Sequence, residues 1–246
     1  MKLPGAIRYR ISLNKDLNEN EVIIKVKKSI AIIETSQVSS ADLKQLCAQI
    51  MPEVTIHEII DSSLIDEVAA NNGPTKGVRN RLYLYYKAAE SLGVDAILNQ
   101  CSSVGEVVDL VQPFISVPIV KVDAAMAEKA VTIGKRIALI ATVESTVGPS
   151  SRLIENTAQR MGKDIILQKR IVKDARMLLI KTGDKERHNQ MVIGEIEEAA
   201  KENDVIVLAQ GSMTVLEPYL DHIKKPVLTS LRMGVHQCRD IIYGNN

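Results

Sequence analysis

The chain has 246 residues, of which 46% are hydrophobic and 25% are charged, and its formal net charge at pH 7 is +1. A chain of this length can bury a large core as one domain or two smaller ones, and its near-zero charge supplies no field that favours nucleic acid or an anionic membrane as a partner. Its three cysteines lie far apart without a CxxC or Cys/His cluster, so a structural metal site is not expected.

No run approaches the ~20 apolar residues of a membrane span, and the N-terminus leads into polar sequence rather than an apolar signal segment. We therefore expect a cytoplasmic protein with reduced thiols and no membrane partner. Residues 1–28 have no counterpart later in the chain. Within them, 7–13 and 22–26 alternate or are rich in β-branched residues, which predicts an N-terminal extension with a β-hairpin.

From Ser29 onward, short apolar runs alternate with stretches of helical spacing. Strands are predicted at 30–33, 54–60, 95–99 and 117–122, and helices at 40–50, 78–92, 106–111 and 123–133. The apolar runs are continuous, as in strands that are covered on both faces. Asp123 is interpreted as the cap of the helix that follows it.

The same alternation restarts after Gly134. Strands are predicted at 136–141, 165–172, 205–209 and 226–229, and helices at 146–161, 174–180 and 185–202, with a final helix up to Tyr243. The alternation predicts right-handed βαβ units and an α/β fold with two pseudo-symmetric lobes, each a four-stranded parallel sheet flanked by helices. We expect the first lobe at 29–134 and the second at 135–230, with a C-terminal helix at 231–246 packing back on the first.

Three pairs of segments support a duplication, since they recur in the same order at a displacement of roughly 110 residues. The segment 30–35 matches 137–142, the segment 97–103 matches 207–213, and the prolines near 113–118 match those near 218–226. In the second match the sequence reads apolar-Leu-small-Gln-X-Ser in both copies. This alignment pairs Cys101 with Gly211.

Open parallel α/β sheets bind ligands beyond the carboxyl ends of their strands. Polar residues follow four predicted strands of this chain, and facing lobes would bring these tips together in an inter-lobe cleft. Hydroxyl groups and unpaired N–H groups at helix starts favour a small carboxylate there. No GxGxxG or Walker sequence follows a strand, which argues against a nucleotide. The predicted substrate-binding residues are Thr35, Ser36, Ser102, Ser103, Thr142, Thr146, Gln210, Gly211 and Ser212.

Cys101 is the candidate reactive residue, because it follows a predicted strand and precedes a predicted helix. A thiol at a helix N-terminus can have a pKa well below the ordinary ~8.5, which would give a useful thiolate fraction at neutral pH. The alternative is a small buried hydrophobic residue, the commonest role of an isolated cysteine. The polar tip and the following serines favour function. Cys47 and Cys238 lie on predicted helices and are expected in the core.

Other polar residues at the tips have two interpretations each. Glu34 is a candidate catalytic base or hydrogen-bond partner, or a solvated loop charge. Thr142 and Thr146 could donate to a carboxylate or cap the helix that follows them. The counterpart of Thr142 in the first half is Thr35, which favours a role in binding.

At these residues the chain resembles the aspartate/glutamate/hydantoin racemase superfamily. Residues 99–103, Asn-Gln-Cys-Ser-Ser, resemble the family's first cysteine motif, and Thr142 with Thr146 resembles its Thr-rich carboxylate-binding loop. Residues 208–212, Leu-Ala-Gln-Gly-Ser, occupy the place of its second cysteine motif. The resemblance runs in order from Ser29 to Tyr243. It implies a two-lobed, cofactor-independent homodimer with a catalytic cysteine at one strand tip in each lobe.

The chain departs from this pattern, since the alignment places Gly211 where the family has its second cysteine. The resemblance implies a racemase or isomerase that transfers a proton at the α-carbon of a small carboxylic acid, an amino acid or a related compound, through Cys101. A one-cysteine lyase, similar to arylmalonate decarboxylase, and a carboxylate-binding protein without turnover are the alternatives. In the two-cysteine reaction one thiolate removes the α-proton and the opposite thiol returns one, and this chain lacks the second thiol.

Overall fold

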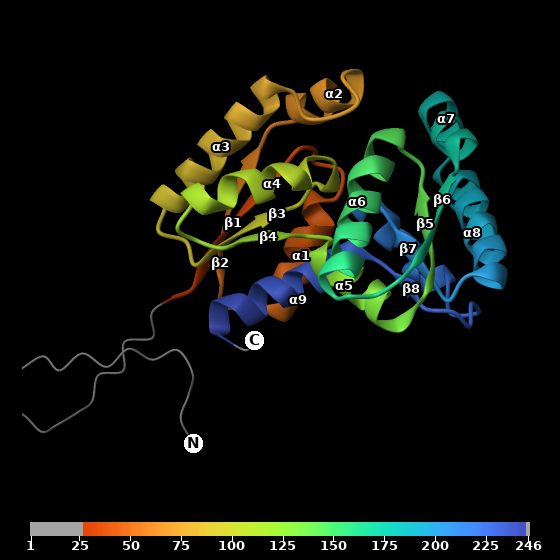
Figure 1. Cartoon of the computed structure of the whole chain (residues 1–246). Coiled ribbons are helices and arrows are strands. Elements are labelled where there is room, and N and C mark those ends of the chain that lie inside the picture. The colour runs from red at the N-terminus through yellow and green to blue at the C-terminus, as the bar shows by residue number, and fades with distance from the viewer. Residues whose placement is uncertain (1–26, 245–246) are drawn as a thin grey trace, which may run out of the picture.

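The computed structural model describes residues 27–244, which form two α/β lobes joined side by side (Figure 1). The hairpin predicted within residues 7–26 lies outside the described residues. Each lobe contains one four-stranded sheet, with the orders β2-β1-β3-β4 and β6-β5-β7-β8, and every strand pair is parallel. The predicted fold class is confirmed.

The first sheet consists of β1 (Ser29–Glu34), β2 (Thr55–Ile60), β3 (Ala96–Asn99) and β4 (Ile119–Lys121). Its connections are α1 (Ser40–Ile50), α2 (Ser63–Ala70), α3 (Lys76–Ser91), the 3-10 turn η1 (Ser102–Val104), α4 (Gly105–Val111) and the 3-10 turn η2 (Gln112–Phe114). The helix α2 was not predicted. Its eight residues are too few to display a convincing helical period.

The second sheet consists of β5 (Arg136–Ala141), β6 (Ile166–Ile171), β7 (Val205–Leu208) and β8 (Val227–Leu228). Its connections are α6 (Glu144–Arg160), α7 (Lys173–Thr182), α8 (Lys185–Glu202) and the 3-10 segment η3 (Gly211–Tyr219), while α5 (Ala124–Ile133) and α9 (Ser230–Tyr243) follow the last strand of each sheet. Thus η1 and η3 begin at corresponding places, just beyond β3 and β7.

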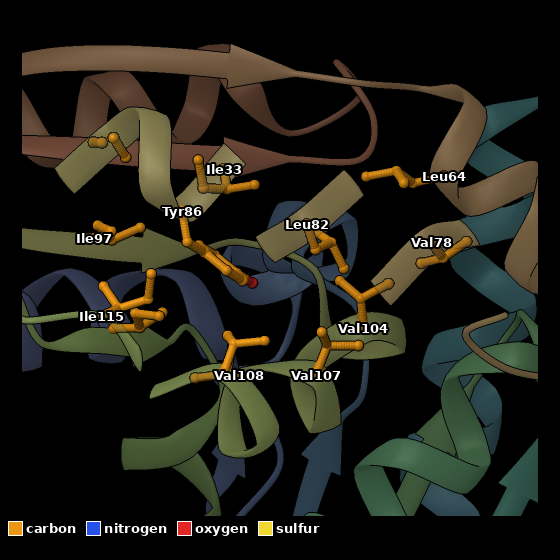
Figure 2. Close-up of a cluster of buried hydrophobic side chains, with 14 of the residues drawn as sticks. Ile33, Leu64, Val78, Leu82, Tyr86, Ile97, Val104, Val107, Val108 and Ile115 are labelled. Carbon is orange, nitrogen blue, oxygen red and sulfur yellow. The ribbon is translucent and has the colours of Figure 1, made fainter. Parts of the chain in front are cut away.

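The central strands are covered on both faces because their side chains alternate between two clusters. Along β1, Ala31 and Ile33 face a cluster formed with α3 and α4, whereas Ile30 and Ile32 face α1 and α9. Figure 2 shows the first of these clusters, with Tyr86 among Ile33, Ile97 and Val108, and Tyr86 is fully buried.

The helices that end the two halves are exchanged between the lobes. Four side chains of α5 pack in the cluster of the second sheet, although the boundary predicted at residue 134 assigned this helix to the first lobe. Reciprocally, α9 packs against α1, β3 and β4 of the first lobe, and Figure 1 shows it beside α1. Each lobe therefore borrows a helix from the other, which couples the two sheets mechanically. In the described part of the chain no helix combines the length and the apolar composition that membrane crossing requires.

Candidate active site

Cys101 lies two residues beyond the end of β3 and is partly exposed. Its backbone is held by Asn99, whose Nδ2 donates to the Cys101 carbonyl oxygen at 3.0 Å, while the Tyr86 hydroxyl donates to Asn99 Oδ1 at 2.9 Å. Both Tyr86 and Asn99 are buried. The tip of β3 is therefore anchored to the core that Figure 2 displays, which fixes the direction in which the cysteine projects.

Burial raises the pKa of the Cys101 thiol, while hydrogen bonds to the Thr35 hydroxyl, to Ser103 and to the Val104 amide partly oppose that rise. The sequence had favoured a lowered pKa, and this expectation is wrong. The physical reason is that the side chain packs against the apolar cluster of the first lobe, and only a short 3-10 turn follows it. The thiol is thus neutral at pH 7 and surrounded by hydrogen-bond donors.

Cys47 and Cys238 lie in the core, as predicted. Both are fully buried in the cluster between α1 and α9. Burial raises the pKa of each of these thiols to about 12. They offer no thiolate near neutral pH.

Glu34 ends β1, and its carboxyl is turned toward α1. Ser40 Oγ donates to Glu34 Oε1 at 2.9 Å and lies 3.2 Å from Glu58 Oε1. Burial raises the pKa of Glu34, and the nearby Glu58 carboxylate adds to that rise. Glu34 is fully buried, so the alternative of a solvated loop charge is wrong. Its hydrogen-bond partners lie on α1 and β2, and the structure does not bring it into hydrogen-bond contact with Cys101.

Strand register corrects the alignment of the two tips. In the first lobe Ile33 pairs with Asn99, and the next amide, that of Gln100, donates to the Ile33 carbonyl. In the second lobe Ile140 pairs with Leu208, and the amide of Ala209 donates to the Ile140 carbonyl. One residue further on, the counterpart of Cys101 is therefore Gln210 and not Gly211.

Local geometry supports the same pairing. Cys101 and Gln210 each immediately precede a 3-10 segment, with φ and ψ of −104° and 117° for the first and −127° and 133° for the second. Cys101 is hydrogen-bonded to Thr35 beyond β1, and Gln210 is hydrogen-bonded to Thr142 beyond β5. The sequence alignment matched Gln100 with Gln210, whereas the strand register makes Gln210 the counterpart of Cys101.

The orientation of the Gln210 amide is determined by its donors. Gln210 Oε1 accepts from the Thr142 amide at 2.7 Å, from the Thr142 hydroxyl at 3.1 Å and from the Val143 amide at 3.3 Å. Backbone amides only donate, so the atom facing them must be the oxygen. Among the hydrogen bonds of residues 27–244, none uses Gln210 Nε2, which leaves its N–H groups for a ligand.

Gly211 lies at the junction of the lobes. A Cβ atom there would be 2.9 Å from Leu231 Cδ2 on α9 and 3.6 Å from Ser39 Oγ of the first lobe. Ser39 Oγ in turn contacts the Gln100 side-chain amide. The absence of a side chain at 211 therefore allows η3 to approach α9.

The remaining predicted residues have different surroundings. Thr146 Oγ1 donates to the Val143 carbonyl at 2.6 Å, and Ser36 Oγ accepts from the Val38 amide at 3.2 Å, so both hydroxyls have local partners. Ser102 is buried and donates to Asp123, and Ser103 is also buried. Ser212 is half-buried in η3. The structure thus brings Thr35, Ser103 and Cys101 together, and separately Thr142 and Gln210.

Asp123 is a buried polar residue at the tip of β4 that the sequence interpretation placed only as a helix cap. Its side chain makes no capping hydrogen bond to α5 and bonds to Ser102 instead. Burial raises the pKa of its carboxyl. The rule that polar residues beyond parallel strands converge could have identified it, since Asp123 follows β4 as Cys101 follows β3.

A pocket of about 200 Å³ opens beside Asp123, between the first lobe and α6. The first lobe contributes Ser102, Gly105, Glu106, Asp109, Lys121 and Asp123, and α6 contributes Pro149, Leu153, Asn156, Thr157 and Arg160. Ser102 connects this pocket with the cysteine tip. Across residues 27–244, no group of three His, Cys, Asp or Glu side chains is arranged to hold a metal ion.

One comparison with known proteins identifies a family for this chain. The family model for Asp/Glu/hydantoin racemase matches residues 30–238. No curated protein sequence matches the chain at a significant level.

Among solved structures, allantoin racemase from Klebsiella pneumoniae is similar with a TM-score of 0.66 and 15% identity, covering 89% of each chain. Aspartate racemase from Picrophilus torridus has a TM-score of 0.62 and 17% identity over 87% of this chain and 94% of its own. Glutamate racemase from Francisella tularensis, solved with D-glutamate, has a TM-score of 0.65 and 12% identity over 89% of this chain and 82% of its own. At such identities these structures establish the fold.

Proposed function

The chain belongs to the Asp/Glu/hydantoin racemase family, and on that premise we propose that it is an isomerase that moves a proton at the α-carbon of a small carboxylic acid through Cys101. The observation that carries the proposal is the environment of the thiol, which is partly exposed at a strand tip and hydrogen-bonded to Thr35, Ser103 and Val104. Such donors stabilise a thiolate while it exists.

In the proposed reaction the Cys101 thiol first loses its proton to solvent. The resulting thiolate takes the α-proton, which forms S–H and leaves the electron pair on an enediolate. The reverse step returns a proton from S–H to the α-carbon. Because burial raises the pKa of the thiol, the neutral form predominates at rest and is the form that donates a proton. The α-C–H bond of a carboxylate is weakly acidic, so the enediolate oxygens require hydrogen-bond donors nearby.

We assign these donors to the predicted binding residues on the two tips. Gln210 supports this assignment best, since its oxygen is engaged by Thr142 and Val143 and its Nε2 has no partner within residues 27–244. The other proposed substrate-binding residues are Thr35, Ser36, Ser102, Ser103, Thr142, Thr146, Gly211 and Ser212. Glu34 stays a predicted catalytic residue whose partners on α1 favour an indirect role through the β1 tip.

Gln210 also bears on the stereochemistry, since a neutral amide takes up a proton far less readily than a thiolate. A reaction with one thiol therefore proceeds from one face of the α-carbon, unless the substrate turns over within the site. Two alternative functions are compatible with this arrangement. One is a one-cysteine lyase, in which carbon dioxide leaves before the thiol protonates the carbanion, and the other is carboxylate binding without turnover.

One experiment distinguishes these possible functions. Aspartate, glutamate, allantoin, a hydantoin and an arylmalonate are incubated with the protein in D2O, and the α-position is examined by mass spectrometry after chiral separation. Deuterium in both enantiomers supports racemisation, and deuterium in one enantiomer supports one-face exchange. Carbon dioxide release supports the lyase, and saturable binding with neither result supports the binding protein.

The assembly and location of the protein are also proposed. The family resemblance implies a homodimer that uses no cofactor. We propose, in line with the near-zero net charge, that it is a cytoplasmic protein that binds neither nucleic acid nor membrane. Light scattering coupled to size-exclusion chromatography measures the mass of the assembly, and a monomeric mass at working concentrations would contradict the dimer.

A further inference from the structure

The pocket between α4 and α6 contains a buried carboxyl group that the proposed proton transfer does not use. Asp123 is 3% exposed. It lines the pocket at the end of β4, and the hydroxyl of Ser102 donates to it. Desolvation disfavours the charged form of such a group, so a cation in the pocket would stabilise Asp123 as a carboxylate.

The other charged groups around the pocket already have partners. Lys121 Nζ lies 2.8 Å from Asp109 Oδ1, and Arg160 pairs at 2.6 Å with Glu128 outside the pocket. Glu106 pairs with Arg152. Among the pocket-lining residues in the described chain, Asp123 is therefore the charged group for which no ion pair is observed. Lys121 still contributes a favourable field at longer range.

The uncharged polar lining groups can accept hydrogen bonds from a ligand that donates them. Asn156 and Thr157 present side-chain oxygens from α6, and a carboxylate at Asp123 only accepts. The volume of about 200 Å³ admits a group of a few heavy atoms together with water. A compact cation with several N–H donors satisfies both the charge and the hydrogen bonds.

We propose that this pocket binds the ammonium group of a small amino compound, with Asp123 as its carboxylate partner. Ser102 joins the two sites, since it follows Cys101 in the chain and hydrogen-bonds to Asp123. The compound is therefore the substrate, and the pocket selects amino acids over the corresponding acids that lack nitrogen. This last step rests on the proposed function, whereas the ammonium site does not.

Binding of methylammonium tests the site without any reaction. Amide shifts of Ser102, Gly105 and Thr157 in NMR spectra are followed during titration, with tetramethylammonium as a cation without N–H groups. Saturable shifts are expected for methylammonium, with affinity at least about tenfold weaker for tetramethylammonium and for Asp123→Asn. Asp174→Asn, which makes the same charge change on exposed α7, serves as the matched control and retains binding.

A second variant keeps the test decisive if Asp123→Asn folds poorly. Asn156 is exposed on α6 at the pocket, so Asn156→Lys supplies a tethered ammonium group while keeping Asp123, and it is expected to weaken methylammonium binding. Equal affinity of wild type and both variants, or no saturable shift in the wild type, overturns the site.

For the substrate claim, Cys101→Ser is titrated with aspartate and with succinate. A preference for aspartate that Asp123→Asn abolishes supports the claim, and equal binding of both acids overturns it even if the protein turns over another substrate.

Discussion

Gln210 occupies in the second lobe the position that Cys101 occupies in the first. Each residue immediately precedes a 3-10 segment, and each is hydrogen-bonded to the threonine that follows the neighbouring strand of its sheet. The duplicated fold therefore presents a thiol at one tip and an amide at the other. Proton transfer is assigned to the first tip and hydrogen-bond donation to the second.

Substitutions of Gln210 separate its two functions. Gln210→Glu keeps an oxygen that accepts from Thr142 and Val143 but removes the Nε2 donor, so we expect near-normal stability with weaker carboxylate binding. Gln210→Leu leaves two backbone amides without their acceptor, and we expect a loss of about 1–3 kcal/mol in unfolding free energy. Urea unfolding and calorimetric titration measure the two quantities. Equal stability of both variants would contradict the assigned amide orientation.

The junction at Gly211 has little room for a side chain. In Gly211→Ala the new Cβ meets Leu231 Cδ2 at 2.9 Å, and we expect a loss of stability of about 1–3 kcal/mol from overpacking. The double variant with Leu231→Ala relieves the clash, so its two effects should not add. The control is Gly194→Ala on α8, where nothing lies within 4 Å of the new Cβ. Because alanine favours helix, this control should gain about 0.5–1 kcal/mol. Similar destabilisation at both positions would refute the steric account.

The raised pKa of the Glu34 carboxyl predicts that the free energy of unfolding depends on pH. Its pKa is raised in the folded protein by burial and by Glu58, so the folded state holds this proton more tightly than the unfolded state. Its favourable contribution is present below the ordinary carboxyl pKa and is lost as pH rises through the folded value. Glu34→Gln should remove this part of the decline, measured by urea unfolding between about pH 4 and pH 8. An unchanged pH profile in Glu34→Gln, relative to the surface variant Glu198→Gln, would exclude this coupling.

The same Glu34→Gln variant tests whether the carboxyl takes part in catalysis. A large fall in kcat with normal binding would favour the catalytic role predicted from sequence. Activity within about twofold of wild type would leave Glu34 as a buried support of the β1 tip, since such a ratio corresponds to well under 1 kcal/mol.

Alkylation by iodoacetamide tests the thiol environment. Because burial raises the pKa of Cys101 and the reactive species is the thiolate, its alkylation should be slow at pH 7 and accelerate above the ordinary thiol range. Thr35→Val removes a hydrogen bond that favours the thiolate, so it should slow alkylation further at each pH. Cys47 and Cys238 should react only on unfolding, since both are fully buried. Peptide mass spectrometry distinguishes the three sites, and fast alkylation of Cys101 at pH 7 would contradict a raised pKa.

The lobes were predictable from sequence because parallel strands that are buried on both faces appear as uninterrupted apolar runs. The runs at 30–33 and 137–140 are buried almost completely in the structure. Polar tips were predictable for the same reason, since the first polar residue after such a run marks the edge of the sheet. Asp123 could have been found by this rule, but an Asp before a helix also fits a cap, and the local pattern did not distinguish the two.

Other features depend on distances between segments that sequence patterns do not encode. The sequence alignment paired Cys101 with Gly211, one residue away from its structural counterpart. The error was hidden because the hydrogen-bond register, and not residue identity, sets which positions correspond. The pKa of Cys101 was misjudged because the packing of the cluster around Tyr86 is a tertiary property. The exchange of α5 and α9 also depends on tertiary packing, and the sequence led us to expect only the C-terminal helix to pack on the other lobe.

The most direct test of the account measures α-proton exchange with solvent deuterium in wild type, Cys101→Ser and Cys47→Ala, using a substrate from the panel above. Cys47→Ala removes a thiol that lies in the core away from the tip, so exchange should persist once folding has been verified. Cys101→Ser should lose exchange by at least about a hundredfold, because a serine hydroxyl is a far weaker acid than a thiol. Exchange at the wild-type rate in Cys101→Ser would contradict the central claim.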